Sequence, residues 1–205
     1  MGDEAAFHRR SIRLRDYDYT QDGVYFITIC AHNRECVFGE IMGGEMKLNR
    51  WGELVRGCWE GIPQHFENVE LDEYIIMPNH VHGIIVINRW DQKNTTAKNT
   101  GVANVGARHA LPLQNKQSPS DNDAPMPAPG KPIAGSLGII VGSFKSAATK
   151  RINEQRGTSG TTIWQRNYYE HVIRNAESLD STRLYVQTNP AQWDADSENP
   201  TNVSV

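Results

Sequence analysis

The sequence has little cysteine, no long hydrophobic run and a low overall hydrophobic content. Hydrophobic residues make up 38% of its 205 residues, fewer than a compact domain of this length usually carries. The absence of a long apolar run excludes a membrane span, and the N-terminus lacks the apolar stretch of a secretory signal. The three cysteines, Cys30, Cys36 and Cys58, show no CxxC or zinc-type spacing. This argues against a disulfide framework or a cysteine metal site, and we expect a reduced, cytoplasmic protein.

Net positive charge is also missing. The chain has 21 Lys and Arg against 24 Asp and Glu, which gives a formal charge of −3. A protein that coats nucleic acid is usually basic throughout, and this chain is not. A total charge near zero is nevertheless compatible with local basic surfaces.

The missing hydrophobic residues are concentrated between Asp91 and Gly135. This stretch has no aromatic residue and contains six of the ten prolines. It cannot bury enough apolar surface to offset the entropy lost on ordering. We therefore interpret residues 91–135 as an insertion in a single domain that spans residues 23–193. A basic N-terminal segment, residues 1–22, precedes this domain, and an acidic flexible tail, residues 194–205, follows it.

The two flanks of the insertion have regular hydrophobic patterns. Period-two patterns and turn residues predict strands or extended segments at 24–31, 36–41, 45–48, 69–77, 80–87 and 163–173. Helical spacing and end signals predict helices from Asn49 to about Phe66, from Ser136 or Ser143 to about Glu154, and from Ala176 to about Thr188. The order predicts an α+β fold, in which helices pack on one face of an antiparallel sheet.

The densest chemical signal is the motif Pro78-Asn79-His80-Val81-His82-Gly83. Side chains alternate along a strand, so His80 and His82 share one face and form a ready pair of metal ligands. The alternative is two histidines on a solvated sheet face. The turn before the pair and the apolar run after it place both side chains on a rigid element.

A second signal lies at the end of the last predicted helix. Tyr185 and Asn189 are four residues apart, so they share one helix face. The amide oxygen of Asn189 could serve as a third ligand, and oxygen ligands suit Mg²⁺ or Mn²⁺. The alternatives are a routine Asn-Pro helix stop and an aromatic ring packed on the sheet.

Four motifs in this order resemble the REP-associated tyrosine transposases, which belong to the single-tyrosine HUH transposase superfamily: PNHVHG, SLGIIVGSFKSAATKRIN, IWQRNYYEHVIRN and YVQTNPAQW. The resemblance runs from about Arg13 to Trp193, interrupted by the insertion. It implies a ferredoxin-like fold with the histidine strand central in the sheet. It also implies a divalent metal, Mg²⁺ or Mn²⁺, on His80, His82 and Asn189, with Tyr185 as the nucleophile. Many relatives have Gln where this chain has Asn189.

The function implied by this resemblance is a metal-dependent single-strand DNA endonuclease and strand transferase that acts on hairpin-forming repeats. The reaction would pass through a 5′-phosphotyrosine intermediate on single-stranded or hairpin DNA. The protein would be a monomer or a homodimer in the bacterial cytoplasm, and it would be associated with the nucleoid when bound to DNA. Two alternatives stay open: a domesticated DNA-binding module without cleavage activity, and a metallohydrolase in which the histidines activate water. Tyr168 and Tyr169 are competing nucleophiles, but on an extended segment they face opposite sides, so at most one can approach the histidines.

The local basic surfaces that DNA requires are present in three segments. One lies near the N-terminus, one in the helix after the insertion, and one beside the tyrosine-rich segment, where aromatic rings could stack on bases. The residues expected to contact DNA are Arg9, Arg10, Arg13, Arg15, Lys145, Lys150, Arg151, Arg166, Tyr168, Tyr169 and Arg174.

Overall fold

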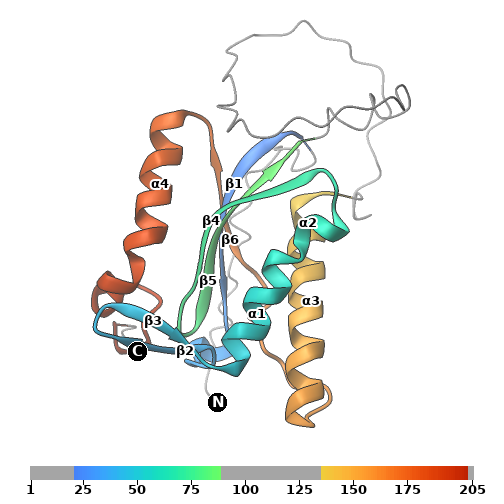
Figure 1. Ribbon diagram of the computed structural model, residues 1–205, viewed down its shortest axis with the longest axis vertical. Helices are drawn as coiled ribbons and strands as arrows, with labels where there is room; N and C mark the ends of the chain where they lie inside the picture. Colours follow the sequence, from blue (N-terminus) through green and yellow to red (C-terminus); the bar gives the residue numbers. More distant parts are fainter. Residues whose placement is uncertain (1–20, 89–134, 203–205) are drawn as a thin grey trace, which may run out of the picture.

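The centre of the fold is a four-stranded antiparallel sheet (Figure 1). The computed structural model describes residues 21–88 and 135–202. Its strands run in the spatial order β4 (Val69–Ile76), β5 (His80–Ile87), β1 (Gly23–Cys30) and β6 (Tyr169–Ile173). A separate hairpin consists of β2 (Gly39–Met42) and β3 (Glu45–Leu48).

The helices complete a βαββαβ arrangement. The long helices are α1 (Arg50–Glu60), α3 (Leu137–Arg156) and α4 (Ala176–Thr188), and α2 (Ile62–His65) is a single turn. Along the chain, β1, α1, β4, β5, α3 and β6 follow one another, and with this sheet order they form the ferredoxin-like topology. The α+β prediction is confirmed, and the histidine strand β5 lies between β4 and β1, central as expected.

The two faces of the sheet have different partners. Tyr25, Ile27 and Ile29 on β1 are fully buried in the main hydrophobic core, together with residues of α1 and α3. Helices α1, α2 and α3 lie on this side of the sheet, whereas α4 lies on the other (Figure 1). The prediction that helices pack on one face therefore holds for the first three, and α4 covers the face that carries the histidines. No helix within residues 21–88 and 135–202 is long and apolar enough to cross a membrane.

Local signals explain where α1 begins and where it ends. The Asn49 side chain caps α1 by accepting hydrogen bonds from the backbone N–H groups of Trp51 and Gly52, at 2.8 and 3.1 Å. The expected helix to Phe66 is instead two helices, α1 and α2. Pro63 near the start of α2 has no N–H to extend the α1 hydrogen-bond ladder, which accounts for the break.

The C-terminal segment differs from the expected flexible tail. As far as Asn202 it is folded against the rest of the protein: Asp196 and Asn199 are only 8% and 5% exposed. The Asn199 amide donates to the carbonyl of Trp193, and the Asn202 amide donates to the carbonyls of Asp194 and Asp196. The same polar side chains that suggested flexibility close the turns of this segment. The expected N-terminal basic segment and insertion lie almost entirely outside the described residues.

Candidate active site

The two histidines of β5 lie side by side on the face that α4 covers. His80 is fully buried and His82 is 3% exposed. Their ring centroids are 4.3 Å apart. The structure therefore brings them together as predicted from the strand alternation, but in a buried setting and not on a solvated sheet face.

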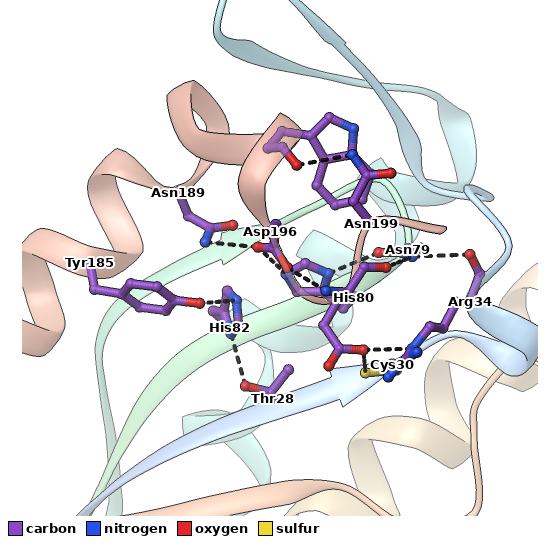
Figure 2. Close-up of polar contacts among 12 residues, drawn as sticks. Thr28, Cys30, Arg34, Asn79, His80, His82, Tyr185, Asn189, Asp196 and Asn199 are labelled. Carbon is purple, nitrogen blue, oxygen red and sulfur yellow. Dashed lines mark hydrogen bonds and ion pairs between the residues drawn. The ribbon is translucent and has the colours of Figure 1, made fainter. Parts of the chain in front are cut away.

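A neighbouring polar side chain orients each ring through Nδ1 (Figure 2). Nδ1 of His80 lies 2.9 Å from Oδ1 of Asn79. The Asn79 amide nitrogen donates to the carbonyls of Arg34 and Glu198, so the amide oxygen is the atom left to accept a hydrogen bond from His80. His80 must then carry its proton on Nδ1, which leaves the Nε2 lone pair free to bind a ligand.

On the neighbouring strand, Thr28 orients the ring of His82 through a hydrogen bond at Nδ1. The two residues are cross-strand partners in the β1–β5 register. Oγ1 of Thr28 lies 2.9 Å from Nδ1 of His82. With Nδ1 engaged by the sheet, Nε2 is the nitrogen that points toward α4 (Figure 2).

Asp196 completes a cluster that could hold a metal ion. One ligand atom each from His80, His82 and Asp196 lie within 4.8 Å of one another. Oδ2 of Asp196 is 3.9 Å from Nε2 of His80. Two imidazoles and one carboxylate form a donor set that divalent cations bind in proteins.

Unsatisfied polar atoms support this interpretation. Nε2 of His80 and Oδ1 of Asn189 are buried without a hydrogen-bond partner among residues 21–88 and 135–202. Asn189 lies beside the cluster, since its amide nitrogen donates to Oδ2 of Asp196 at 3.0 Å. Buried polar atoms usually have partners, and a cation would satisfy the His80 nitrogen. The ligand role predicted for Asn189 stays a prediction.

Burial keeps both histidines in the neutral form that binds metals. It lowers the pKa of His80 to about 3, with a further contribution from the positive charge of Arg34. Burial also lowers the pKa of His82 well below its usual value, assisted by His80 and opposed by the Asp196 carboxylate. At neutral pH the rings therefore carry no proton that a cation must displace.

Tyr185 of α4 reaches the same cluster. Its hydroxyl lies 3.3 Å from Nε2 of His82, and the two rings meet edge to face with centroids 5.2 Å apart. The side chain is 41% exposed, so a substrate has access to it. Burial raises its pKa, and the charge of Asp196 raises it further, against the opposing hydrogen bond from Asn189. The phenol is therefore protonated at neutral pH.

The opening beside Tyr185, which we call the first groove, has a volume of about 1000 Å³. Its lining includes His82, Tyr185, residues of α3 and residues of the segment before β6. Among the residues expected to contact DNA, Lys145, Arg166, Tyr168 and Tyr169 line this groove. Tyr169 pairs with Thr28 and so shares its face, whereas Tyr168 packs against the core, in line with the predicted opposite orientations.

The structure does not gather all of the expected basic residues at this groove. Lys150 lines a neighbouring groove, and Arg151 lines a hollow between α3 and the α1–α2 region. Arg174 follows the end of β6 and lines none of these three openings. The four N-terminal arginines, Arg9, Arg10, Arg13 and Arg15, lie outside the described residues.

Comparison with known proteins establishes the family of the chain. No family model matches it. An uncharacterized protein of Haemophilus influenzae is 40% identical to it over 189 residues, which are 92% of each protein. The chain belongs to the family of that protein.

Among solved structures, a REP-associated tyrosine transposase bound to a REP hairpin superposes with a TM-score of 0.50. The match covers 90% of this chain and 74% of that one, at 14% sequence identity. At this identity the match shows a shared fold. It agrees with the ferredoxin-like topology that the strand order defines.

Sequence reasoning missed Asp196, Thr28 and Asn79. Asn79 belongs to the histidine motif, and its amide beside His80 was a signal that could have been used. Asp196 lies seven residues after Asn189, in a segment whose acidic composition suggested flexibility. No pattern marked Thr28, because its role depends on which strand pairs with β5.

Proposed function

We propose that this protein is a metal-dependent single-strand DNA endonuclease and strand transferase, transposase-like, with Tyr185 as its nucleophile. The observation that carries the proposal is the position of the Tyr185 hydroxyl, 3.3 Å from Nε2 of His82 in a cluster suited to a cation. The fold shared with a transposase, whose structure contains a REP hairpin, supports a hairpin-forming DNA substrate.

His80, His82 and Asp196 would hold the cation, with Asn189 as a further oxygen donor. Of the two ions expected, Mn²⁺ suits this mixed set better, since Mg²⁺ strongly prefers oxygen ligands. When bound, the cation supplies positive charge for the scissile phosphate. Nε2 of His82 has one lone pair, so the Tyr185 contact and a metal bond at this atom exclude each other.

The bond changes in the proposed reaction balance without an energy source. The Tyr185 oxygen attacks phosphorus and loses its phenolic proton to solvent. The bond from phosphorus to the 3′ oxygen breaks, and that oxygen leaves with a proton as a free 3′-OH. Tyr185 stays joined to the 5′ phosphate until another 3′-OH attacks and releases it. Phe26, whose ring meets that of Tyr185 edge to face at 6.0 Å, helps to hold the nucleophile in place.

The first groove would hold the strand. The amine of Lys145 donates to the carbonyls of Gln165 and Arg166, at 2.6 and 3.0 Å, and so fixes the part of the loop that lines the groove. Arg166 supplies charge for phosphates, and Tyr169 supplies an exposed ring for a base.

The test is a covalent protein–DNA adduct that survives SDS. We expect the wild-type protein to form one with a hairpin-bearing single-stranded oligonucleotide and Mn²⁺, and Tyr185→Phe to form none. Tyr169→Phe is the matched control, because it removes a hydroxyl from the same groove and should leave the adduct. An adduct in Tyr185→Phe, or none in the wild type with any divalent ion, would refute the proposal.

Metal binding is measured separately. Asp196→Asn should weaken Mn²⁺ binding, followed by calorimetry or electron paramagnetic resonance, by at least about tenfold. Asn189→Ala tests whether the amide is also a ligand. Unchanged affinity in Asp196→Asn would remove Asp196 from the set of metal ligands.

A water-activating metallohydrolase is the second candidate, and one observation favours it. Asp196 supplies a carboxylate beside the two histidines, as in zinc enzymes that activate water. Metal-dependent DNA cleavage that leaves no adduct and persists in Tyr185→Phe would identify this reaction.

A further inference from the structure

A second groove lies beyond the candidate active site, between the C-terminal half of α3 and the loop that follows it. Its volume is about 850 Å³. The loop, residues 157–166, turns at Gly157 and Gly160, which have φ values of 67° and 81°. A Cβ at either glycine would meet no atom within 4 Å, so the wall here is open.

The second groove adjoins the first. Lys145, Gln165 and Arg166 line both. The two hydrogen bonds from the Lys145 amine hold this part of the loop against α3. A chain molecule that lies against Tyr185 would therefore reach the second groove by passing Arg166.

The lining of the second groove suits a polyanion. Lys145, Lys150 and Arg166 line it, and Glu154 is the single acidic residue among the residues that line it. The ion pair between Lys150 and Glu154 is loose, at 3.9 Å with side chains 75% and 61% exposed, so it costs little to break. Hydroxyl groups, which donate to phosphate oxygens, supply much of the remaining wall: Ser146, Thr149, Ser159, Thr161 and Thr162.

Aromatic surface distinguishes the two grooves. Phe26, Tyr168, Tyr169 and Tyr185 line the first groove. The one aromatic residue that lines the second, Trp164, is 4% exposed and packs on Phe38 and Phe144. Without an exposed ring for stacking, the second groove is suited to phosphates and not to bases.

We propose that the second groove binds the sugar–phosphate backbone of the single-stranded DNA that flanks the reacting phosphate, without regard to sequence. This inference rests on the proposed function for the position of the strand. It gives the protein a track of two parts: a first groove that contacts bases and the reacting phosphate, and a second that holds the flank by charge.

The experiment measures binding by fluorescence anisotropy in the Tyr185→Phe protein, which keeps the strand uncut. The probes are a hairpin oligonucleotide that ends near the cleavage site and the same oligonucleotide with homothymidine tails of increasing length, on the 5′ or the 3′ side. We expect a tail on one side to tighten binding, and Lys150→Glu to abolish that gain. The slope of log affinity against log salt should fall by about 0.7 for each phosphate that the variant no longer neutralises.

Lys47→Glu is the matched control, because Lys47 is an exposed lysine on β3, bonded to Glu45, and lines neither groove. It should keep the full gain from the tail. The inference is overturned if no tail tightens binding, or if Lys150→Glu retains the gain. Adduct formation by the wild-type protein and by Lys150→Glu on the short oligonucleotide is scored in parallel. If no adduct forms, the proposed reaction is refuted. The effect of tail length on binding then still tests whether the second groove holds the DNA backbone.

Discussion

Replacing Gly83 by alanine tests how the histidine strand is supported from the opposite side of the sheet. Gly83 follows His82 and therefore faces the core. The indole of Trp59, from α1, lies directly against it: a Cβ at residue 83 would meet Cζ2 in a severe clash, Cη2 at 2.7 Å and Cε2 at 3.1 Å. Carbon atoms normally approach to about 3.5–4.0 Å, so the indole or the strand must move.

Neither can move easily. Trp59 is fully buried, and its ring packs on Tyr74 and Phe144 with centroids 5.9 and 5.2 Å away. Strand β5 is paired on both sides, where Gly83 faces Ile27 and Tyr74. Overpacking of this kind costs about 1–3 kcal/mol. For a domain of this size we expect Tm to fall by about 3–10 °C.

The assay is chemical and thermal unfolding of Gly83→Ala, Trp59→Phe and the double variant. Phenylalanine lacks the outer ring atoms that the new methyl group meets, so the double variant should lose less stability than the sum of the single changes. Gly57→Ala is the matched control. Gly57 is exposed inside α1, and a Cβ there meets nothing within 4 Å, so this change should stabilise by about 0.5–1 kcal/mol. A neutral Gly83→Ala, or strictly additive effects in the double variant, would refute the packing argument.

Two further predictions concern helix α4, which carries Tyr185, and the response to acid. Arg183 donates through Nε and Nη2 to both carboxylate oxygens of Asp72, at 2.9 and 2.6 Å. Because the pair is partly exposed, Arg183→Met should cost about 0.5–1 kcal/mol of stability and speed the hydrogen exchange of α4. The charge swap, Asp72→Arg with Arg183→Asp, should restore slow exchange. In chelator, the free energy of unfolding should fall as the pH falls from about 6.5 to about 3, by at most about 1.4 kcal/mol per pH unit from His80, and the lowered pKa of His82 acts in the same direction. Acid destabilises the protein because His80 and His82 bind protons in the unfolded chain and stay neutral in the folded one. His80→Gln should therefore reduce the dependence of the free energy of unfolding on pH, measured by denaturant titrations.

Much of the fold could be predicted because its signals are local. The alternation of polar and apolar residues predicted the strands, and Asn49 predicted the start of α1. Strand geometry alone placed His80 and His82 on one face. Helix geometry likewise predicted that Tyr185 and Asn189 share one face, and in the structure Asn189 directly follows the end of α4. Each of these relations depends on residues close in sequence, whose geometry the backbone period fixes.

Asp196 shows where local signals fail. Its segment is acidic and polar, a composition that by itself is typical of a mobile tail. The carboxylate is nevertheless buried, because Asn189 and the backbone N–H of Glu198 donate to it and the segment packs beside β5. No periodic pattern in the sequence carries that information.

The sequence by itself determined the strand that carries the histidine pair, the helix that carries Tyr185 and the topology that the order of these elements permits. Only the tertiary structure decided that α4 covers the histidine face, that Asp196 joins the cluster and that two grooves meet at Arg166. The physical reason is that backbone periodicity acts over a few residues, whereas these positions depend on contacts between distant segments. In the structure, Tyr185 and His82 are in contact although 103 residues of sequence separate them.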